Sequence, residues 1–256
     1  MADLLGQSFA GCTIIAELGR GGFGSVYKAR QTELNRLVAV KVLSRDLSED
    51  PEYVSRFKRE AASAGGLSHV NIVQVYAAGT FEQLHYFVME FVDGESLQRR
   101  IEREGKLAPT EALAICMYVA EALDYAWKRV KLIHRDIKPA NIFIAHSGDV
   151  KLGDLGLAKI ADASTEFTRT GTVMGSPNFI SPEQAQAKKE IDFRADIYSL
   201  GCTLYHMVTG CLPYEGAGDA LAIIHKHVYD PPPAIFTVWP TCPMPLAMLV
   251  GKMVAK

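Results

Sequence analysis

Ile133-His134-Arg135-Asp136-Ile137-Lys138-Pro139-Ala140-Asn141-Ile142-Phe143-Ile144 is the stretch that decides the fold, because it sets charged and amide side chains between apolar residues. Its apolar flanks predict a polar loop anchored in a core, although such a cluster is also typical of an ordinary turn. Thirteen residues after Asn141 comes another carboxylate, Asp154. Amide and carboxylate oxygens suit Mg²⁺ held against phosphates. Asp136 then remains to accept a proton from an attacking hydroxyl.

This loop resembles the catalytic loop of protein kinases, where Asn follows His-Arg-Asp at a fixed distance, and Asp154-Leu155-Gly156 resembles their Asp-Phe-Gly motif. The resemblance implies that Asp136 is the catalytic base and that Lys138 neutralises the transferred phosphate. It also implies that Asn141 and Asp154 hold Mg²⁺, for which Mn²⁺ is an alternative. Leu155 stands where Phe is usual, and we expect it to tune the balance between active and inactive states.

A glycine-rich stretch, Leu18-Gly19-Arg20-Gly21-Gly22-Phe23-Gly24-Ser25-Val26, lies between segments with strand-like alternation. Glycines let backbone N–H groups approach phosphate oxygens, and a flexible hairpin tip is the alternative. Dinucleotide-binding folds use similar glycines, but there a helix follows the last glycine. Residues 25–29 are strand-like instead, which disfavours a dinucleotide-binding dehydrogenase.

Lys41 ends the apolar run Val38-Ala39-Val40, twenty-two residues after Gly19. A surface position is the usual case for a single lysine, but the pairing with the glycine-rich stretch resembles the first lobe of kinases. The resemblance implies that Lys41 contacts the α- and β-phosphates of ATP and pairs with Glu60. Glu60 falls on a helix that Asp50-Pro51 is predicted to begin, and Glu52 is the competing partner.

Residues 85–94 are predicted to form a strand that ends in a hinge, where the resemblance places the adenine of ATP. Met89 would lie at the back of that pocket, and the backbone of Glu90 and Val92 would bond the base. Glu95 either binds the ribose hydroxyls or is a helix N-terminal carboxylate. The implied ATP site comprises Leu18, Gly19, Gly21, Gly22, Phe23, Gly24, Val26, Ala39, Lys41, Met89, Glu90, Val92, Glu95 and Phe143.

The fold class predicted is α+β, with the two-lobe arrangement of protein kinases. Residues 1–92 form the β-rich lobe and residues 93–256 the mostly helical lobe, together one kinase domain. Helices are expected at 95–104, 110–128, 192–210, 217–228 and 244–255, and strands at 141–144 and 149–152. Kinases usually continue past this point with an Asp-Pro-x-x-Arg turn and a last helix, so we expect a C-terminally truncated domain.

Residues 154–183 are a long, threonine-containing stretch of the kind that is usually functional or disordered. Its end, Gly175-Ser176-Pro177-Asn178-Phe179-Ile180-Ser181-Pro182-Glu183, resembles the end of a kinase activation segment, with Ser176 for Thr and Ser181 for Ala. The resemblance implies control by phosphorylation, with Arg135 as the partner of the phosphate. The favoured sites are Thr170, then Thr168 and Thr172.

Asp196 begins the run Asp196-Ile197-Tyr198-Ser199-Leu200-Gly201, which resembles the start of the kinase helix whose Asp holds the catalytic-loop backbone. An ordinary charge at a helix N-terminus is the alternative interpretation of Asp196.

The whole composition is that of an ordinary soluble globule, with 48% hydrophobic residues, 22% charged residues and a net charge of −2. That balance disfavours nucleic acid as a partner. Five cysteines without metal-like spacing predict free thiols in a reducing compartment, so we expect a cytoplasmic protein. No signal peptide and no apolar run of about 20 residues is visible, and a membrane anchor beyond residue 256 is left open.

Together these motifs predict ATP-dependent phosphorylation of Ser or Thr in protein substrates, in signal transduction. Lys138 favours Ser/Thr over Tyr specificity, and the glycine-rich start resembles the eukaryotic-like Ser/Thr kinases of bacteria. A homodimer that phosphorylates itself in trans is a further expectation. The rival hypothesis is a pseudokinase that binds nucleotide without chemistry, but its usual mark, loss of the Lys, the catalytic Asp or the metal Asp, is absent.

Overall fold

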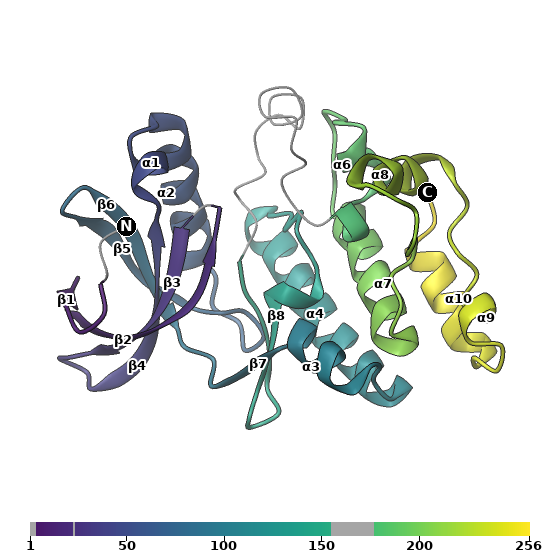
Figure 1. Ribbon diagram of the computed structural model, residues 1–256, viewed down its shortest axis with the longest axis horizontal. Helices are drawn as coiled ribbons and strands as arrows, with labels where there is room; N and C mark the ends of the chain where they lie inside the picture. The colour runs from purple at the N-terminus through teal and green to yellow at the C-terminus, as the bar shows by residue number, and fades with distance from the viewer. Residues whose placement is uncertain (1–3, 23, 155–176) are drawn as a thin grey trace. The chain divides into compact units, whose positions relative to one another are not determined.

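The computed structural model describes residues 4–22, 24–154 and 177–256, and its backbone is drawn in Figure 1. The chain divides into two compact units, residues 1–93 and 94–256. The boundary predicted from the sequence lies one residue earlier, between 92 and 93. Each unit has its own sheet and its own helices, and each is described by itself.

The first unit is built on an antiparallel sheet of six strands in the order β1-β2-β3-β4-β6-β5. The strands are β1 (Ser8–Phe9), β2 (Cys12–Gly21), β3 (Gly24–Gln31), β4 (Arg36–Leu43), β5 (Val75–Phe81) and β6 (Leu84–Glu90). Side chains alternate across the sheet, as a period of two requires. Val38, Val40 and Val42 of β4 pack in a core cluster with Phe9 and Tyr27. Ala39 and Lys41 therefore project from the opposite face.

Helix α2 (Pro51–Gly65) packs on that opposite face, after the short helix α1 (Arg45–Ser48). Phe57 and Ala61 of α2 form a second buried cluster with Leu43 and Phe87 of the sheet. The predicted start of α2 is confirmed, because the Asp50 side chain accepts a hydrogen bond of 2.9 Å from the backbone of Glu52. An Asp cap satisfies one of the N–H groups left unpaired at a helix start.

The second unit combines a three-stranded antiparallel sheet, β7-β8-β9, with helices. The strands are β7 (Gly94–Ser96), β8 (Ile142–Ala145) and β9 (Val150–Leu152). The helices are α3 (Leu97–Glu104), α4 (Pro109–Val130), α6 (Pro182–Ala185), α7 (Arg194–Thr209), α8 (Ala220–Tyr229), α9 (Ile235–Val238) and α10 (Met244–Met253), with the 3-10 turns η1 (Pro139–Asn141) and η3 (Pro177–Phe179).

The prediction that a helix begins at residue 95 is wrong by two residues. Gly94, Glu95 and Ser96 form β7, paired with β8 in the register Gly94↔Ala145. A side chain at Gly94 would overlap the carbonyl oxygen of Ile144, so only glycine permits this close pairing. Helix α3 begins at Leu97. The residue before it, Ser96, is the cap, and its hydroxyl accepts a hydrogen bond from the backbone N–H of Arg99.

Helix α7 is the centre of the second unit, because every residue from Tyr198 to Val208 is buried. It lies between α4 and α10, which both pack against it (Figure 1). The sequence of a helix that is buried on all sides has apolar residues around its whole circumference, whereas a surface helix has them on one face. Gly201 allows the close approach of α10, since a Cβ there would lie 2.7 Å from that of Met253. Within the described residues, no helix combines the length and the hydropathy that crossing a membrane requires.

Candidate active site

The loop that carries Asp136 is anchored by His134, which is completely buried. Its Nδ1 accepts the backbone N–H of Asp136 at 3.3 Å, so the ring proton must be on Nε2. Nε2 in turn donates to the carbonyl oxygen of Gly153 at 3.1 Å. The ring therefore ties Asp136 to the residue that precedes Asp154. His134 is a functional residue that was not predicted from the sequence, because its burial is not visible there.

Asp196 provides a second anchor from the first turn of α7. Its two carboxylate oxygens accept the backbone N–H groups of His134 at 2.8 Å and Arg135 at 2.7 Å. The expectation that Asp196 holds the loop backbone is thus confirmed. Burial raises the pKa of Asp196, while the hydrogen bonds from His134 and Arg135 favour its ionised form. Arg135 itself adopts a left-handed backbone conformation, with a φ of 64°.

Asp136 keeps its carboxylate half-buried between a cation and an amide. Its Oδ2 lies 2.9 Å from the Nζ of Lys138 and accepts a hydrogen bond of 3.0 Å from the Nδ2 of Asn141. Asn141 also donates to the carbonyl oxygen of Asp136, at 2.8 Å. Three predicted site residues are therefore brought together. Because both bonds of Asn141 use its nitrogen, its amide oxygen is the atom suited to a metal.

The two predicted metal ligands are connected through the backbone. The N–H of Gly153 donates to the carbonyl oxygen of Asn141 at 2.9 Å, which places Asp154 next to this loop. Asp154 is exposed and has a φ of 47°. In the described parts of the chain, no group of three or more His, Cys, Asp or Glu residues forms a metal site. Two hard oxygen ligands fit a cation such as Mg²⁺, whose remaining ligands come from water and phosphate.

In the first unit, several predicted ATP residues share one face of the sheet. Val26 lies opposite Lys41 across β3 and β4, and Ala39 lies opposite Met89 across β4 and β6. Directly paired residues project from the same face, so these four side chains form one patch. The Nζ of Lys41 lies 5.6 Å from the ring centroid of Phe87.

Other predicted residues of the first unit are only partly placed. Glu60 lies on α2, but its side chain is outside the described residues, so its pairing with Lys41 stays a prediction. The N–H of Glu90 donates to Gln74, at 2.8 Å. Hydrogen bonding of Glu90 to a base would therefore use its carbonyl oxygen. Val92 is half-buried and Leu18 exposed.

The glycines of the predicted phosphate loop differ in what surrounds them. Gly21 pairs with Gly24 across the β2–β3 hairpin, whose two-residue tip is Gly22-Phe23, with Phe23 outside the described residues. Gly24 has a φ of 151°, and a Cβ there would overlap the backbone of Val42. A Cβ at Gly19 or Gly21 would meet no atom within 4 Å. Packing therefore requires glycine at 24, whereas 19 and 21 leave space for a ligand's close approach.

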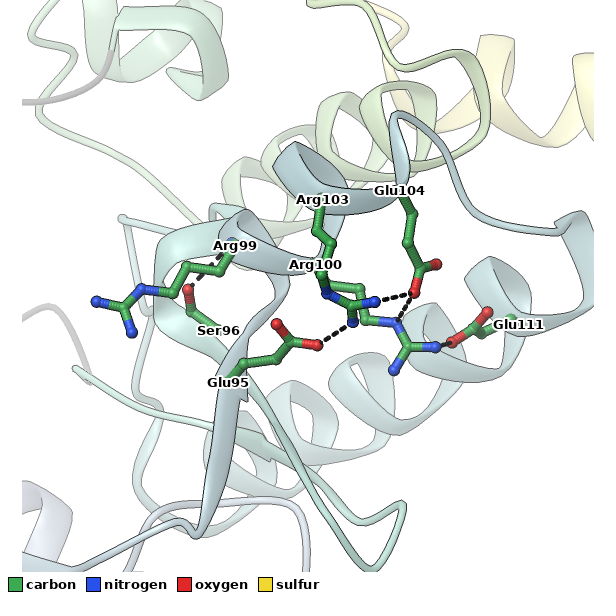
Figure 2. A network of polar contacts seen from close by, with 7 residues as sticks. All are labelled: Glu95, Ser96, Arg99, Arg100, Arg103, Glu104 and Glu111. Atoms are coloured by element: carbon green, nitrogen blue, oxygen red, sulfur yellow. Dashed lines mark hydrogen bonds and ion pairs between the residues drawn. The ribbon is translucent and has the colours of Figure 1, made fainter.

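Glu95 belongs to a network of ion pairs on β7, α3 and α4, drawn in Figure 2. Its Oε1 lies 2.5 Å from Arg103, which lowers the pKa of Glu95. Arg103 also pairs with Glu104, and Arg100 joins Glu104 to Glu111 at 3.2 and 2.9 Å. Glu95 precedes the cap of α3, so it is not a first-turn carboxylate. Its binding of ribose stays a prediction.

The remaining predicted residues are placed only in part. Phe143 is half-buried on β8 and pairs with Ser96. Thr168, Thr170 and Thr172, together with Leu155 and Ser176, lie outside the described residues.

Comparison with known proteins gives consistent matches. The family described as "Protein kinase domain" matches residues 12–255. The probable serine/threonine-protein kinase PknB of Lactococcus lactis is 41% identical over 95% of this chain and 38% of its own length. The serine/threonine-protein kinase PrkC of Bacillus subtilis is 39% identical, over 99% of this chain and 39% of its own. The chain thus spans less than two fifths of the length of these curated relatives.

Solved structures match as well. The kinase domain of Mycobacterium tuberculosis PknI is 30% identical to this chain, with a TM-score of 0.77. That match covers 99% of this chain and 92% of the solved one.

Proposed function

Because the chain belongs to the protein kinase domain family, we propose that it transfers the γ-phosphoryl group of ATP to Ser or Thr hydroxyls of proteins. The α+β, two-lobe kinase fold expected from the sequence is confirmed by the solved kinase domains. The observation that carries the proposal is the Asp136 carboxylate, which Lys138 and Asn141 hold in place. The similarity to bacterial serine/threonine-protein kinases supports this acceptor class.

Residues 94–256 act on the acceptor and on the transferred group. Asp136 orients the hydroxyl and accepts its proton as the bond to phosphorus forms. Lys138, which already neighbours Asp136, offsets the negative charge of the phosphoryl group. Asn141 and Asp154 hold Mg²⁺ or Mn²⁺, which neutralises phosphate charge when bound. Most of the rate enhancement then comes from positioning and from charge stabilisation.

Residues 1–93 hold the nucleotide. The space around Gly19 and Gly21 lets their N–H groups approach phosphate oxygens. Lys41 contacts the α- and β-phosphates, and Glu60 positions Lys41. Val26, Ala39 and Met89, which project from one face of the sheet with Lys41, contact the adenine. Glu95 is the candidate for the ribose hydroxyls, which would replace Arg103 as its partner.

Control by phosphorylation between residues 165 and 172 is the regulatory part of this proposal. A phosphothreonine adds about −1.5 to −2 charge and three strong acceptors, which suit Arg135. Thr170 is the favoured site, followed by Thr168 and Thr172. In a transient homodimer, one copy transfers the phosphoryl group of its ATP to the other copy. Mass spectrometry after incubation with Mg-ATP, with the three Thr→Ala variants, tests it. Full activity in the triple variant would exclude this form of control.

Transfer of radiolabelled phosphate from ATP to a generic basic protein tests the activity itself. We expect Lys41→Met to abolish transfer and Glu60→Gln to weaken it less, because Glu60 acts only through Lys41. Lys58→Met is the matched control, since Lys58 is exposed on α2 and is not among the residues assigned to the nucleotide. Nucleotide binding without transfer by the wild-type protein would leave a nucleotide-binding module and exclude a kinase.

A further inference from the structure

Gln184 reaches from α6 to the catalytic loop, 49 residues earlier in the sequence. Its Nε2 donates to the carbonyl oxygen of Arg135 at 2.8 Å. Gln184 is 8% exposed, and helix α6, labelled in Figure 1, begins at Pro182, near the end of the stretch 154–183. A carbonyl oxygen only accepts hydrogen bonds, so the amide NH₂ of Gln184 must face Arg135.

Ser181 sets the orientation of that amide. Its hydroxyl and its backbone N–H both donate to the Oε1 of Gln184, at 3.0 and 3.4 Å. The backbone N–H of Gln184 donates to the Ser181 hydroxyl oxygen at 3.4 Å, and the two bonds from backbone N–H groups form a capping box at the start of α6. Because Ser181 is completely buried, water does not compete for its hydroxyl. Alanine at position 181 would lose both bonds of the hydroxyl and keep only the weaker one from the backbone N–H.

The bond from Gln184 acts on the peptide plane that precedes Asp136. The Arg135 carbonyl and the Asp136 N–H belong to one peptide unit, which is planar and rotates as a body. Gln184 holds the oxygen side of this plane, and His134 Nδ1 accepts the N–H on the other side. Asp196 holds the preceding N–H, that of Arg135. The left-handed conformation of Arg135 is sparsely populated for such a residue, so it depends on these contacts.

We infer that Gln184, oriented by Ser181, is a positioning residue that holds Asp136 in its productive orientation. It does so from the end of the segment that resembles the kinase activation segment. The inference rests on the proposed kinase activity. A displaced Asp136 lowers turnover while nucleotide binding, in which Asp136 has no assigned contact, stays the same.

Steady-state kinetics of Gln184→Met test the inference. Methionine keeps the length of the side chain and removes its donor. We expect kcat to fall about tenfold, equivalent to ~1.4 kcal/mol in the barrier, with the KM for ATP within about twofold of wild type. Gln186→Met is the matched control, because Gln186 is exposed at the end of the same helix. An unchanged kcat in Gln184→Met, or equal losses in the two variants, would overturn the inference.

A double-mutant cycle adds a second arm. Ser181→Ala should lower kcat about threefold in the wild-type background and have no effect in Gln184→Met, since its role is to orient Gln184. Additive losses would contradict that role.

Hydrogen exchange tests the inference apart from activity and without Gln184→Met, should that variant not fold. We expect faster exchange of the amides of residues 134–136 in Ser181→Ala. Unchanged exchange would contradict the role of Ser181 and Gln184 in holding this loop. If the wild-type protein transfers no phosphate, the proposed function fails, while the exchange experiment still reports on the contact.

Discussion

Asp136 differs from the other carboxylates of the chain by its contacts rather than by its own chemistry. One of its carboxylate oxygens forms an ion pair with Lys138 and accepts a hydrogen bond from Asn141. Its backbone N–H donates to the ring of His134. The carboxylate is 24% exposed, so a substrate hydroxyl can reach it. A carboxylate that is fixed in direction and still accessible meets the geometric condition for a general base.

Asp136→Asn should lower the turnover number by about 100-fold or more, the scale of a lost general base, and leave ATP affinity nearly unchanged. Asparagine keeps the shape of the Asp136 side chain, and its amide oxygen can still accept the hydrogen bond from Asn141. The measurements are kcat and the dissociation constant for ATP. Asp124→Asn is the control, since Asp124 is 57% exposed and pairs with Lys128 on the surface. A collapse of ATP affinity with retained turnover would assign Asp136 to binding.

At the scale of elements, the β2–β3 hairpin uses its glycines for two purposes. Gly24 is required by β4, because its φ of 151° and the nearby carbonyl of Val42 exclude any side chain. Gly21, its partner across the hairpin, has open space where a Cβ would lie. The glycine-rich motif alone does not show which glycine serves which purpose, because the residue type is the same at both positions.

Gly24→Ala should lower the free energy of unfolding by about 1–3 kcal/mol, the usual cost of a side chain in a strained conformation. Gly21→Ala should leave stability nearly unchanged and raise the KM for ATP instead. Urea unfolding and steady-state kinetics of the two variants distinguish the purposes. If Gly21→Ala leaves the KM for ATP unchanged, Gly21 does not contact the phosphates.

Helix α8 buries an ionisable ring, His227, which is completely inaccessible. Its Nδ1 lies 2.8 Å from the hydroxyl of Tyr198, and its ring packs edge-on against Tyr214, 4.7 Å between centroids. Burial, and to a lesser degree the charge of Lys256, lowers the pKa of His227 to about 4. Between the usual histidine pKa of about 6.5 and the folded-state pKa of about 4, the unfolded chain therefore binds a proton that the folded chain does not.

Stability should accordingly fall as the pH drops from 6.5 towards 4, and this contribution is fully present above pH 6.5. For His227 alone, the free energy of unfolding should decrease by about 2 kcal/mol between pH 7.5 and pH 5. Urea unfolding at both pH values should show a smaller decrease in His227→Gln. His225→Gln, an exposed site on the same helix, should behave like the wild type. If the free energy of unfolding depends on pH equally in all three proteins, the pKa of His227 is not lowered in the folded state.

At the scale of the whole molecule, the five cysteines lie in both units and are all free. Cys12, Cys116, Cys202 and Cys242 are buried, and Cys211 is half-buried. Burial raises the pKa of each thiol, and that of Cys116 to about 11. A raised pKa keeps a thiol protonated and unreactive at neutral pH.

Ellman's reagent at pH 7.5 should detect five thiols in the denatured protein and at most one, reacting slowly, in the native protein. Cys211→Ser should remove the native reaction. Rapid labelling of several thiols in the native state would show that the core opens more readily than its burial indicates.

Features that depend on near neighbours in the chain could be predicted from the sequence. The loop around Asp136, the glycine-rich hairpin and the run that ends at Lys41 are recognisable because their chemistry needs certain residue types at short, fixed spacings. The start of α2 at Asp50-Pro51 is equally local, since a cap bonds to backbone within one turn. The kinase fold follows from the order of these motifs along the chain.

Features whose partners lie far away in sequence became visible only in the folded protein. Residues 95 and 96 form a strand because β8 offers its edge, although their own pattern suits a helix. Gly24 is needed because β4 lies against it, and the pKa of His227 is lowered because the ring is buried, beside Tyr198 and Tyr214. Gln184 meets Arg135 across 49 residues, and no spacing rule connects them. Burial and long-range hydrogen bonds arise only when the chain folds back on itself, so these contacts have no local signature.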